Sequence, residues 1–410
     1  MGNTSSYTLR VKNDFLIPQN QKIFQEKYSY LVLAAVIILT IVVFAGSLKL
    51  GWTNWDDNYY VYENPLVHEA VIGDIFTRPA AYNTYNPLVI SSFALEWKLA
   101  GDRPFLYHLD NLILHLFCTV LVLMLFRRMG ISIWWSGFGA LLFGIHPLRV
   151  ESVAWITERK DVLYGFFYLL ALLAYLRYLV SRQKSYFLLT FVLFVLSLLS
   201  KGQAVGLPFA LVLLDWYCGR KMDWKAVTEK LVFFAFALLV GLLGTTFFFQ
   251  NVYRTIDSRA IANAFNFFEQ LVLAGDAYAI YILKFFIPYG TSPLYPVPAV
   301  LNAGHWVGAV AAVLIFAWAV AVRRKYKFVT FGLLFFTFNI VFLLMPFLAS
   351  DSAYLNDRYI YMAYVGLAFS VAFSMQELAE QQPASRLSLA VSAVAVLVIF
   401  GILTIKYIPV

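Results

Sequence analysis

Residues 28–60 read YSYLVLAAVIILTIVVFAGSLKLGWTNWDDNYY, so that a long apolar run ends shortly before an acidic pair, Asp56 and Asp57. An apolar run of about 20 residues can cross a bilayer as a helix. Three lysines within residues 12–27 precede the run, and basic residues favour the cytoplasmic end of a span. We therefore expect a cytoplasmic N-terminus and place the two carboxylates at the outer membrane face.

The composition excludes an ordinary soluble protein. The 410 residues are 61% hydrophobic, 18% aromatic and only 13% charged, whereas soluble domains average about 25% charged residues. The net charge of +8 includes basic clusters at the ends of apolar runs, where they orient spans and contact anionic lipid headgroups. We expect contacts with membrane lipids and none with nucleic acid. Two cysteines, Cys118 and Cys218, exclude a disulfide framework or a cysteine metal site.

Apolar runs recur along the whole chain and predict an all-α polytopic membrane protein. Eleven spans agree with the positions of the basic clusters, and twelve are the alternative. After the first span at residues 28–50, we expect spans at residues 105–126, 131–145, 162–180, 186–199, 204–217, 231–249, 306–322, 328–346, 359–375 and 387–405.

The segment 261–289 is the uncertain one. It is apolar enough to cross, but it contains Glu269, Asp276 and Lys284. A crossing here would move the basic cluster at residues 323–327 to the outside, against the positive-inside tendency. We therefore predict an interfacial or re-entrant element on the outer side.

The predicted organisation is a single membrane domain. Residues 1–27 are expected to be a cytoplasmic segment, 28–405 the transmembrane domain and 406–410 an outer C-terminal end. Residues 51–104 would form the first outer loop, with short interfacial helices, and 250–305 a second large outer region. No helical repeat with a period of 34 residues follows the last run, so no repeat domain is expected.

The acidic pair suits carbohydrate chemistry. Sugar faces are apolar and sugar hydroxyls need acceptors, and here aromatic residues flank the carboxylates. An ionised aspartate can take the proton from a hydroxyl that attacks an anomeric carbon. A merely solvated acidic loop is the alternative. The sequence has no Walker loop, dinucleotide fingerprint, nucleophile elbow or zinc helix. Because nucleotide donors are absent outside the cytoplasm, the donor that fits is a polyprenyl-phosphate sugar.

Basic residues are disfavoured on the outer face, yet the predicted topology puts four there: Arg159, Lys160, Lys201 and Arg358. A lipid phosphate would hold them, since arginine binds phosphate bidentately and lysine supplies a point charge. The alternative is internal pairing, of Glu158 with Arg159 or Lys160 and of Asp357 with Arg358.

Three polar residues near the start of the second span lie on one helical face. His108, Asn111 and His115 are spaced i, i+3 and i+7. Polar groups within spans usually face a cavity or another helix. These side chains therefore either line a cavity or bond neighbouring helices.

Five motifs occur in order between residues 30 and 375: Trp55-Asp56-Asp57 continuing into Glu63-Asn64-Pro65, His108 to His115 with Asn111, His146-Pro147 through Glu151 to Asp161, Lys201-Gly202 and Asn356-Asp357-Arg358-Tyr359. Together they resemble the membrane domain of the transmembrane and tetratricopeptide-repeat O-mannosyltransferases and their bacterial relatives. That group lies within the C-type (GT-C) glycosyltransferase superfamily.

The resemblance implies a GT-C-like fold and inverting transfer of mannose or a similar hexose from a polyprenyl-phosphate donor. Asp56 would be the general base, and Asp57 would orient the acceptor or bind a metal. A divalent cation is the one cofactor considered. The donor phosphate would lie at Arg358, Arg159, Lys160 and Lys201. Acceptor or sugar binding is expected at Trp55, Tyr59, His108, Asn111, His115, His146, Glu151, Glu158 and Asp357.

The acceptor stays open between a protein, a lipid and a glycan. A flippase or transporter of lipid-linked sugars is the other functional class, although its polar residues would line the bilayer midplane. A scaffold protein would need neither the external acidic pair nor the external basic groups. The expected location is the bacterial inner membrane with the site facing the periplasm, or the lumenal face in a eukaryote.

Overall fold

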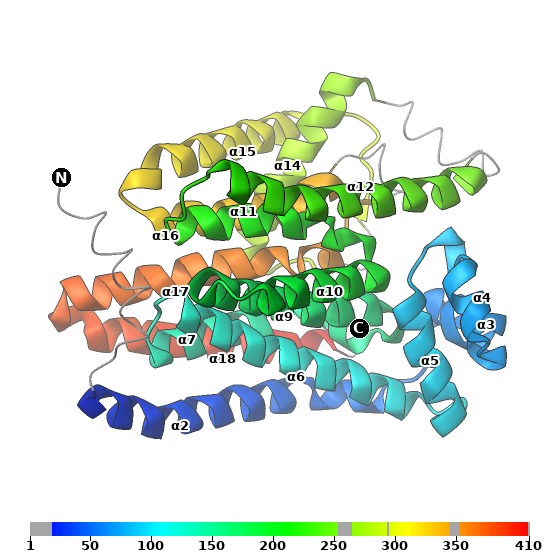
Figure 1. The fold of residues 1–410 in the computed structure, drawn as a ribbon, viewed down its shortest axis with the longest axis horizontal. Coiled ribbons are helices and arrows are strands. Elements are labelled where there is room, and N and C mark those ends of the chain that lie inside the picture. The colour runs from blue at the N-terminus through cyan, green and yellow to red at the C-terminus, as the bar shows by residue number, and fades with distance from the viewer. Residues whose placement is uncertain (1–18, 253–264, 293–294, 345–352, 409–410) are drawn as a thin grey trace.

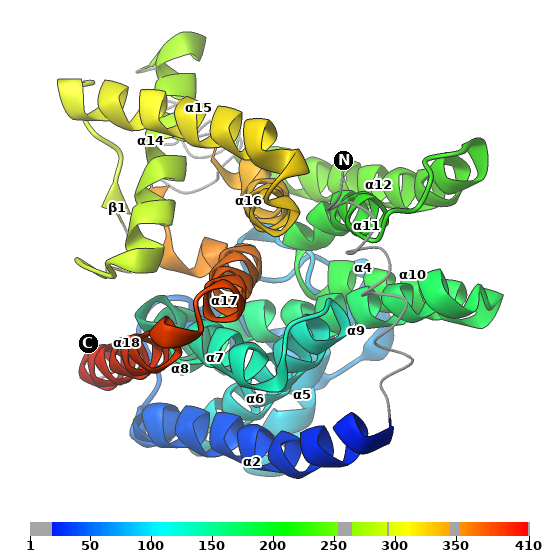
Figure 2. The ribbon, with the colours of Figure 1, turned by 90° about the vertical axis from the view of Figure 1, so that its left-hand side faces the viewer.

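The computed structural model describes residues 19–252, 265–292, 295–344 and 353–408, and most of them are helical. Long helices run side by side along the horizontal direction of Figure 1, and Figure 2 looks along them. Most of the expected cytoplasmic segment 1–27, part of the outer region 250–305 and the end of the segment 406–410 lie outside the described residues.

Each predicted span coincides with a helix. The helices are α2 (Gln19–Phe44), α6 (Pro104–Arg128), α7 (Ile133–Gly144), α9 (Arg159–Ser181), α10 (Lys184–Ser200), α11 (Leu207–Tyr217), α12 (Trp224–Val252), α15 (Ala303–Ala321), α16 (Lys327–Ile340), α17 (Ala363–Gln381) and α18 (Arg386–Tyr407).

Five helical segments of the described chain are long and apolar enough to cross a bilayer: Tyr28–Lys49, Pro104–Arg128, Ile156–Ser181, Ala303–Arg324 and Pro383–Tyr407. Three shorter apolar helices, Ile133–Gly144, Lys184–Ser200 and Lys327–Leu343, lie beside them in the bundle. The membrane character is therefore clear, while the count of eleven crossings stays a prediction.

The predicted first outer loop, residues 51–104, contains short helices, and its place on the outer side of the membrane stays a prediction. They are α3 (Pro65–Glu69), α4 (Ile72–Thr77) and α5 (Pro87–Ala100), and they gather at the right-hand end of Figure 1. Proline begins α3, α5 and α6, where its missing N–H costs no helical hydrogen bond. Buried residues such as Val67, Ile75 and Phe93 form a small core of their own in this loop.

The uncertain segment contains α14 (Phe267–Phe286). In Figure 2 this helix is seen from the side, whereas α16 and α17 are seen nearly end-on, so α14 lies across the bundle. Its three charged residues are all bonded: Glu269 forms a capping box with Asn266, Asp276 accepts from Tyr354, and Lys284 pairs with Asp357. A helix across the bundle agrees with the interfacial or re-entrant interpretation, and its place on the outer side of the membrane stays a prediction.

The all-α prediction misses one feature. Strands β1 (Tyr295–Pro296) and β2 (Ala353–Leu355) pair antiparallel, with Tyr295 opposite Leu355. Both strands belong to connections between helices, where extended backbone can satisfy its polar groups only by pairing with another segment or with water. This pair brings the segment after α14 beside the one before α17.

The eleven-span topology can be tested by cysteine labelling in a variant whose Cys118 and Cys218 are replaced by alanine. We expect an impermeant maleimide to label Ser292→Cys in intact cells and Arg324→Cys only after permeabilisation, because the first lies outside and the second inside. Twelve spans would reverse both results. Glu69→Cys and Trp224→Cys serve as external and internal controls, since both topologies place them alike.

Candidate functional site

The two aspartates of the first outer loop point in different directions. Asp57 is fully buried. Its Oδ2 accepts hydrogen bonds from the backbone and the hydroxyl of Thr53, each at 2.9 Å. Its Oδ1 accepts from the backbone of Thr157 at 3.1 Å and from the Thr157 hydroxyl. Asp57 therefore anchors the loop to the segment before α9, and the predicted acceptor-orienting or metal-binding role stays a prediction.

Asp56 is half-buried and lies on the other side of the turn, beside Tyr60 and Tyr82. The pKa of Tyr82 is raised to about 12, first by burial and then by the negative charge of Asp56. The ammonium of Lys160 lies 4.6 Å from the centre of the Tyr60 ring. Asp56 thus lies close to Tyr60, Tyr82 and Lys160. The exposed ring of Tyr59 is nearby and contacts the ring of Tyr82.

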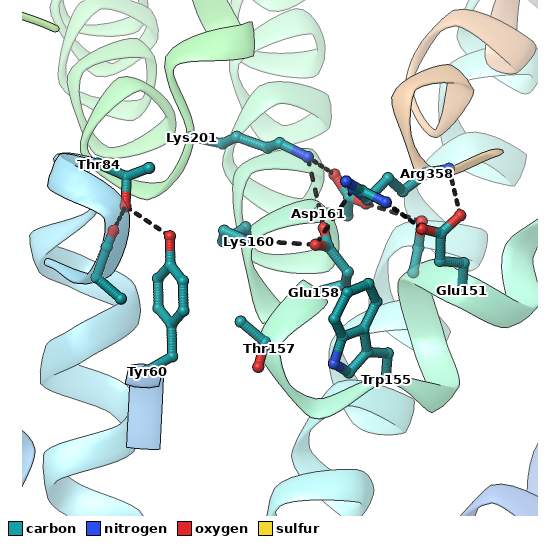
Figure 3. A network of polar contacts seen from close by, with 12 residues as sticks. Tyr60, Thr84, Glu151, Trp155, Thr157, Glu158, Lys160, Asp161, Lys201 and Arg358 are labelled. Atoms are coloured by element: carbon teal, nitrogen blue, oxygen red, sulfur yellow. Dashed lines mark hydrogen bonds and ion pairs between the residues drawn. The ribbon is translucent and has the colours of Figure 1, made fainter. Parts of the chain in front are cut away.

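An ionic cluster surrounds Glu158, whose side chain is buried directly before α9 (Figure 3). Its Oε1 lies 3.2 Å from Nζ of Lys160 and 3.5 Å from Nε of Arg358. Its Oε2 lies 3.6 Å from Nζ of Lys201, which also pairs with Asp161. Three of the four basic residues expected at a phosphate site therefore meet at one carboxylate.

The cluster retains hydrogen-bonding capacity. Neither oxygen of Glu158 accepts a hydrogen bond of normal geometry within the described part of the chain. Lys160 pairs with Glu158 at 3.2 Å, and its side chain is only 12% exposed. An ammonium has three donors, so an anion beside the cluster could also accept a hydrogen bond from Lys160.

Arg159 points to the opposite side of α9, which corrects its expected place at the phosphate. Its guanidinium is completely buried. All five of its N–H donors have acceptors: Ser92 Oγ, both oxygens of Glu96, the Tyr107 carbonyl and Asn111 Oδ1. Because no donor is left for a ligand, Arg159 joins the first outer loop to α6 and α9, and we drop its phosphate-binding role.

Arg358 does not form the pair with Asp357 that was the alternative to phosphate binding. Its backbone N–H donates to Glu151 Oε2 at 3.0 Å, and its Nη1 donates to Glu151 Oε1. Asp357 instead pairs with Lys284 at 3.1 Å and accepts from the Tyr295 hydroxyl at 2.9 Å. Both carboxylates thus have basic partners supplied by other segments.

The charge of Glu151 depends on its burial. Burial raises the pKa of Glu151 to about 8, although the guanidinium of Arg358 acts in the opposite direction. Near neutral pH, the carboxyl of Glu151 is therefore shifted toward its protonated form. The three cations Lys160, Lys201 and Arg358 face the carboxylates of Glu158, Asp161 and Asp56, and protonation of Glu151 removes a further negative charge beside Arg358.

A cavity of about 590 Å³ opens beside the cluster. Three tryptophans line it, Trp52, Trp55 and Trp155, together with the carboxyl groups of Glu151 and Asp357. The rings of Trp55 and Trp155 meet edge to face, with their centroids 5.7 Å apart. A concave site of this size, mostly apolar with a few polar groups, is typical of small-molecule binding. Three residues expected to bind acceptor or sugar, Trp55, Glu151 and Asp357, are brought together here.

Two of the three polar residues on the expected face of α6 bond neighbouring segments. Asn111 donates to the carbonyl of Trp155 at 3.0 Å. His115 bonds the Tyr361 hydroxyl at 2.9 Å and the Gly144 carbonyl at 2.7 Å. Both residues therefore bond neighbouring segments, which is the alternative to lining a cavity that the sequence left open.

The other two histidines expected to bind the acceptor, His108 and His146, are buried as well. His146 accepts from the backbone of Leu148 at 3.2 Å and bonds the Phe285 carbonyl at 3.0 Å. Burial, aided by the positive charge of Arg149, lowers the pKa of His146 to about 3, so it stays neutral. His108 has no hydrogen-bond partner for either ring nitrogen among the residues described. Their predicted role in acceptor binding stays a prediction.

Several residues of the site were not predicted. Lys284, Trp52 and Asp161 take part in the contacts above, and Glu96 holds Arg159. Lys284 is visible in the sequence as a charge within an apolar segment, but no spacing links it to Asp357. No cluster of three or more His, Cys, Asp or Glu side chains suited to a metal occurs in the described ranges, and the divalent cation stays a prediction.

The chain is an integral membrane protein, and comparisons with known proteins indicate its relatives. No protein-family model matches it. Protein O-mannosyl-transferase tmtc2 of Xenopus laevis is 36% identical over 113 residues, which cover 28% of this chain and 14% of the relative. TMTC2 of Mus musculus is 30% identical over 160 residues, covering 38% and 19%. Tmtc1 of Drosophila melanogaster is 31% identical over 188 residues, covering 42% and 21%.

These matches confirm the predicted resemblance to the O-mannosyltransferases, and they span between 14% and 21% of the length of the three relatives. Among solved structures, the crystal structure of ArnT from Cupriavidus metallidurans bound to undecaprenyl phosphate aligns with 93% of this chain and 76% of its own. The TM-score is 0.36 and the identity 16%, a likeness too weak to carry an inference.

The raised pKa of Glu151 predicts a pH-dependent stability. The stabilisation by protonated Glu151 is complete below the ordinary carboxyl pKa of 4.5 and is lost as the pH rises through about 8. Glutamine mimics the protonated form. We therefore expect the melting temperature of Glu151→Gln to rise relative to that of the wild type between about pH 4.5 and about pH 8, and the difference to stay constant at higher pH.

Thermal unfolding in detergent at each pH measures this difference. The matched control is Glu69→Gln, which changes an exposed carboxyl in the same outer region and should give a constant difference. A constant difference for Glu151→Gln as well would contradict the raised pKa.

Proposed function

We propose that this protein transfers a sugar from a polyprenyl-phosphate donor to an acceptor hydroxyl at the outer face of the membrane. The observation that carries the proposal is the meeting of Lys160, Lys201 and Arg358 at Glu158, at the end of the bundle that also holds the Asp56 loop. The similarity to proteins named O-mannosyl-transferases supports mannose or a similar hexose as the sugar.

The cation cluster suits the phosphate of the donor. Lys160 and Lys201 supply point charges, and Arg358 can bind phosphate oxygens through its fork of donors. As the bond between the anomeric carbon and the phosphate oxygen breaks, negative charge grows on the leaving polyprenyl phosphate. Cations that are already in place stabilise that charge without rearranging. Protonation of Glu151 removes the charge of one of the two carboxyl groups beside Arg358 and so favours this binding.

Asp56 is the residue of the acidic pair that we assign as general base. It is half-buried and lies near Lys160, whereas Asp57 is fully buried and holds Thr53 and Thr157. In the proposed step the acceptor hydroxyl gives its proton to Asp56, and its oxygen bonds the anomeric carbon. The phosphate leaves from the opposite face with the electron pair, so the anomeric configuration inverts.

The tryptophan-lined cavity is assigned to the sugar or the acceptor. Its aromatic walls can pack on the apolar face of a sugar ring, and the Glu151 and Asp357 carboxyl groups can bond hydroxyls. The chemistry does not distinguish among protein, lipid and glycan acceptors. A flippase is less well supported, because these polar groups gather at one end of the helices rather than at mid-length. We place this end in the periplasm of a bacterium, or in the lumen of a eukaryotic cell.

Substituting each aspartate of the pair separately tests the proposal. We expect Asp56→Asn to lower turnover by about 10²- to 10⁴-fold, the usual contribution of a general base, with little change in melting temperature. Asp57→Asn should lower the melting temperature, because its amide nitrogen would face donors and each unsatisfied buried group costs about 1–3 kcal/mol.

The assay uses purified protein, a polyprenyl-phosphate mannose donor and separate peptide, glycan and lipid acceptors. Glu69→Gln, with an exposed carboxyl in the same outer loop, is the control and should behave as the wild type. Full turnover by folded Asp56→Asn would remove Asp56 as the base. Failure of the wild type with every acceptor would count against the proposed function itself.

A further inference from the structure

A second and larger cavity lies at the other end of α9. Its volume is about 1200 Å³, and it is lined by α6, α9, α10 and the turn between α11 and α12. The ionic cluster lies at the start of α9 and this cavity at its end, near Arg182. The 23 residues of α9 rise by about 34 Å in total, so the two sites are separate.

The charge of the cavity is strongly one-sided. Its lining contains a single acidic residue, Asp223, and six basic ones: Arg128, Arg177, Arg182, Arg220, Lys221 and Lys225. Arg220 is neutralised by Glu229 at 2.7 Å. In contrast, Arg177, Arg182, Lys221 and Lys225 form no ion pair with a carboxylate of the described chain. The cavity thus offers several cations without counter-charges.

Aromatic contacts position two of these arginines. The guanidinium of Arg182 lies 5.9 Å from the ring centre of Tyr178, and that of Arg177 lies 5.8 Å from the ring centre of Tyr186. The Tyr178 hydroxyl donates to Glu229 at 2.6 Å, which fixes the ring. Arg182 also has a φ of +58° at the end of α9, a left-handed conformation that is uncommon outside glycine. The backbone is therefore strained at Arg182, the residue that lines the cavity at the end of α9.

One wall of the same cavity is apolar. It is formed by Leu121, Met124, Leu170, Leu173, Leu189 and Leu193, from three neighbouring helices. Met124 and Leu189 are more than 40% exposed, as expected for side chains that face lipid tails. A soluble anion would need the basic rim only. An apolar wall below a basic rim matches an amphiphile with an anionic head.

We propose that this basic cavity binds an anionic phospholipid, with its phosphate among Arg177, Arg182 and Lys221 and its acyl chains along the leucine wall. Arginine can hold phosphate oxygens bidentately. Basic pockets between membrane helices on the cytoplasmic side are suited to anionic headgroups, and the expected topology puts this end of α9 in the cytoplasm. The site is independent of the glycosyl-transfer proposal.

The test measures lipid affinity of the full-length protein in detergent by thermal shift and by native mass spectrometry. The probes are dioleoylphosphatidylglycerol, dioleoylphosphatidylcholine and sodium phosphate. We expect phosphatidylglycerol alone to bind and stabilise the wild type. The double variant Arg177→Gln/Arg182→Gln should lose about 10- to 30-fold in affinity for it, since each basic group near a lipid surface contributes measurably to binding.

A matched control removes the same number of charges at the same end of the bundle. Arg323 and Arg324 are exposed at the turn after α15 and lie outside the cavity. The variant Arg323→Gln/Arg324→Gln should therefore keep the wild-type affinity for phosphatidylglycerol. If Arg177→Gln/Arg182→Gln fails to fold, Lys221→Gln/Lys225→Gln removes two charges from the cavity's other wall and should give the same loss.

Three results would overturn the proposal. Equal binding of phosphatidylcholine would show that the site does not select charge. Binding of sodium phosphate with the same dependence on Arg177 and Arg182 would identify a soluble anion as the ligand. Equal losses of affinity for phosphatidylglycerol in the cavity variant and the control variant would show that the effect comes from general surface charge.

Discussion

The structure depends on the burial of three charged residues where α9 begins, Glu158, Arg159 and Asp161, with Lys160 among them only 12% exposed. A buried ion must be paired, and removing one partner of a buried pair costs about 3–5 kcal/mol. The partners here come from distant segments: Glu96 in the first outer loop, Lys201 after α10 and Arg358 before α17. Because these charges must be paired, the predicted outer loop, the end of α10 and the segment before α17 all contact the start of α9.

The helical turn divides this segment into two faces with different tasks. On one face, Arg159 uses every donor to bond the predicted outer loop and α6, and Asp57 bonds Thr157, two residues before Arg159. These bonds hold the loop that contains Asp56. On the other face, Lys160, Lys201 and Arg358 meet at the carboxylate of Glu158. In this account, the contacts of Arg159 and Asp57 position the base Asp56, and the cluster around Glu158 binds an anion.

The sequence predicts the helices of this protein well and their polar contacts only partly. A helix occurs at every apolar run that we predict as a span, because length and hydropathy suffice for a helix in a bilayer. Reasoning from local sequence patterns does not distinguish the roles of adjacent charged residues. Asp56 and Asp57, or Arg159 and Lys160, look equivalent in sequence, yet about 100° of helical rotation separates neighbouring side chains. The pairing of Lys284 with Asp357 depends on how α14 crosses the bundle, which no local pattern contains.

The most direct test of the central claim is the dependence of turnover on the guanidinium of Arg358. The measurement is kcat and KM for a polyprenyl-phosphate mannose donor with wild type, Arg358→Ala, Arg358→Lys and, as control, Arg103→Ala, an exposed arginine of the same outer region. Stabilisation of the departing phosphate predicts a fall in kcat larger than any rise in KM, partial recovery with lysine and no effect in the control. Wild-type kcat in folded Arg358→Ala would contradict the account.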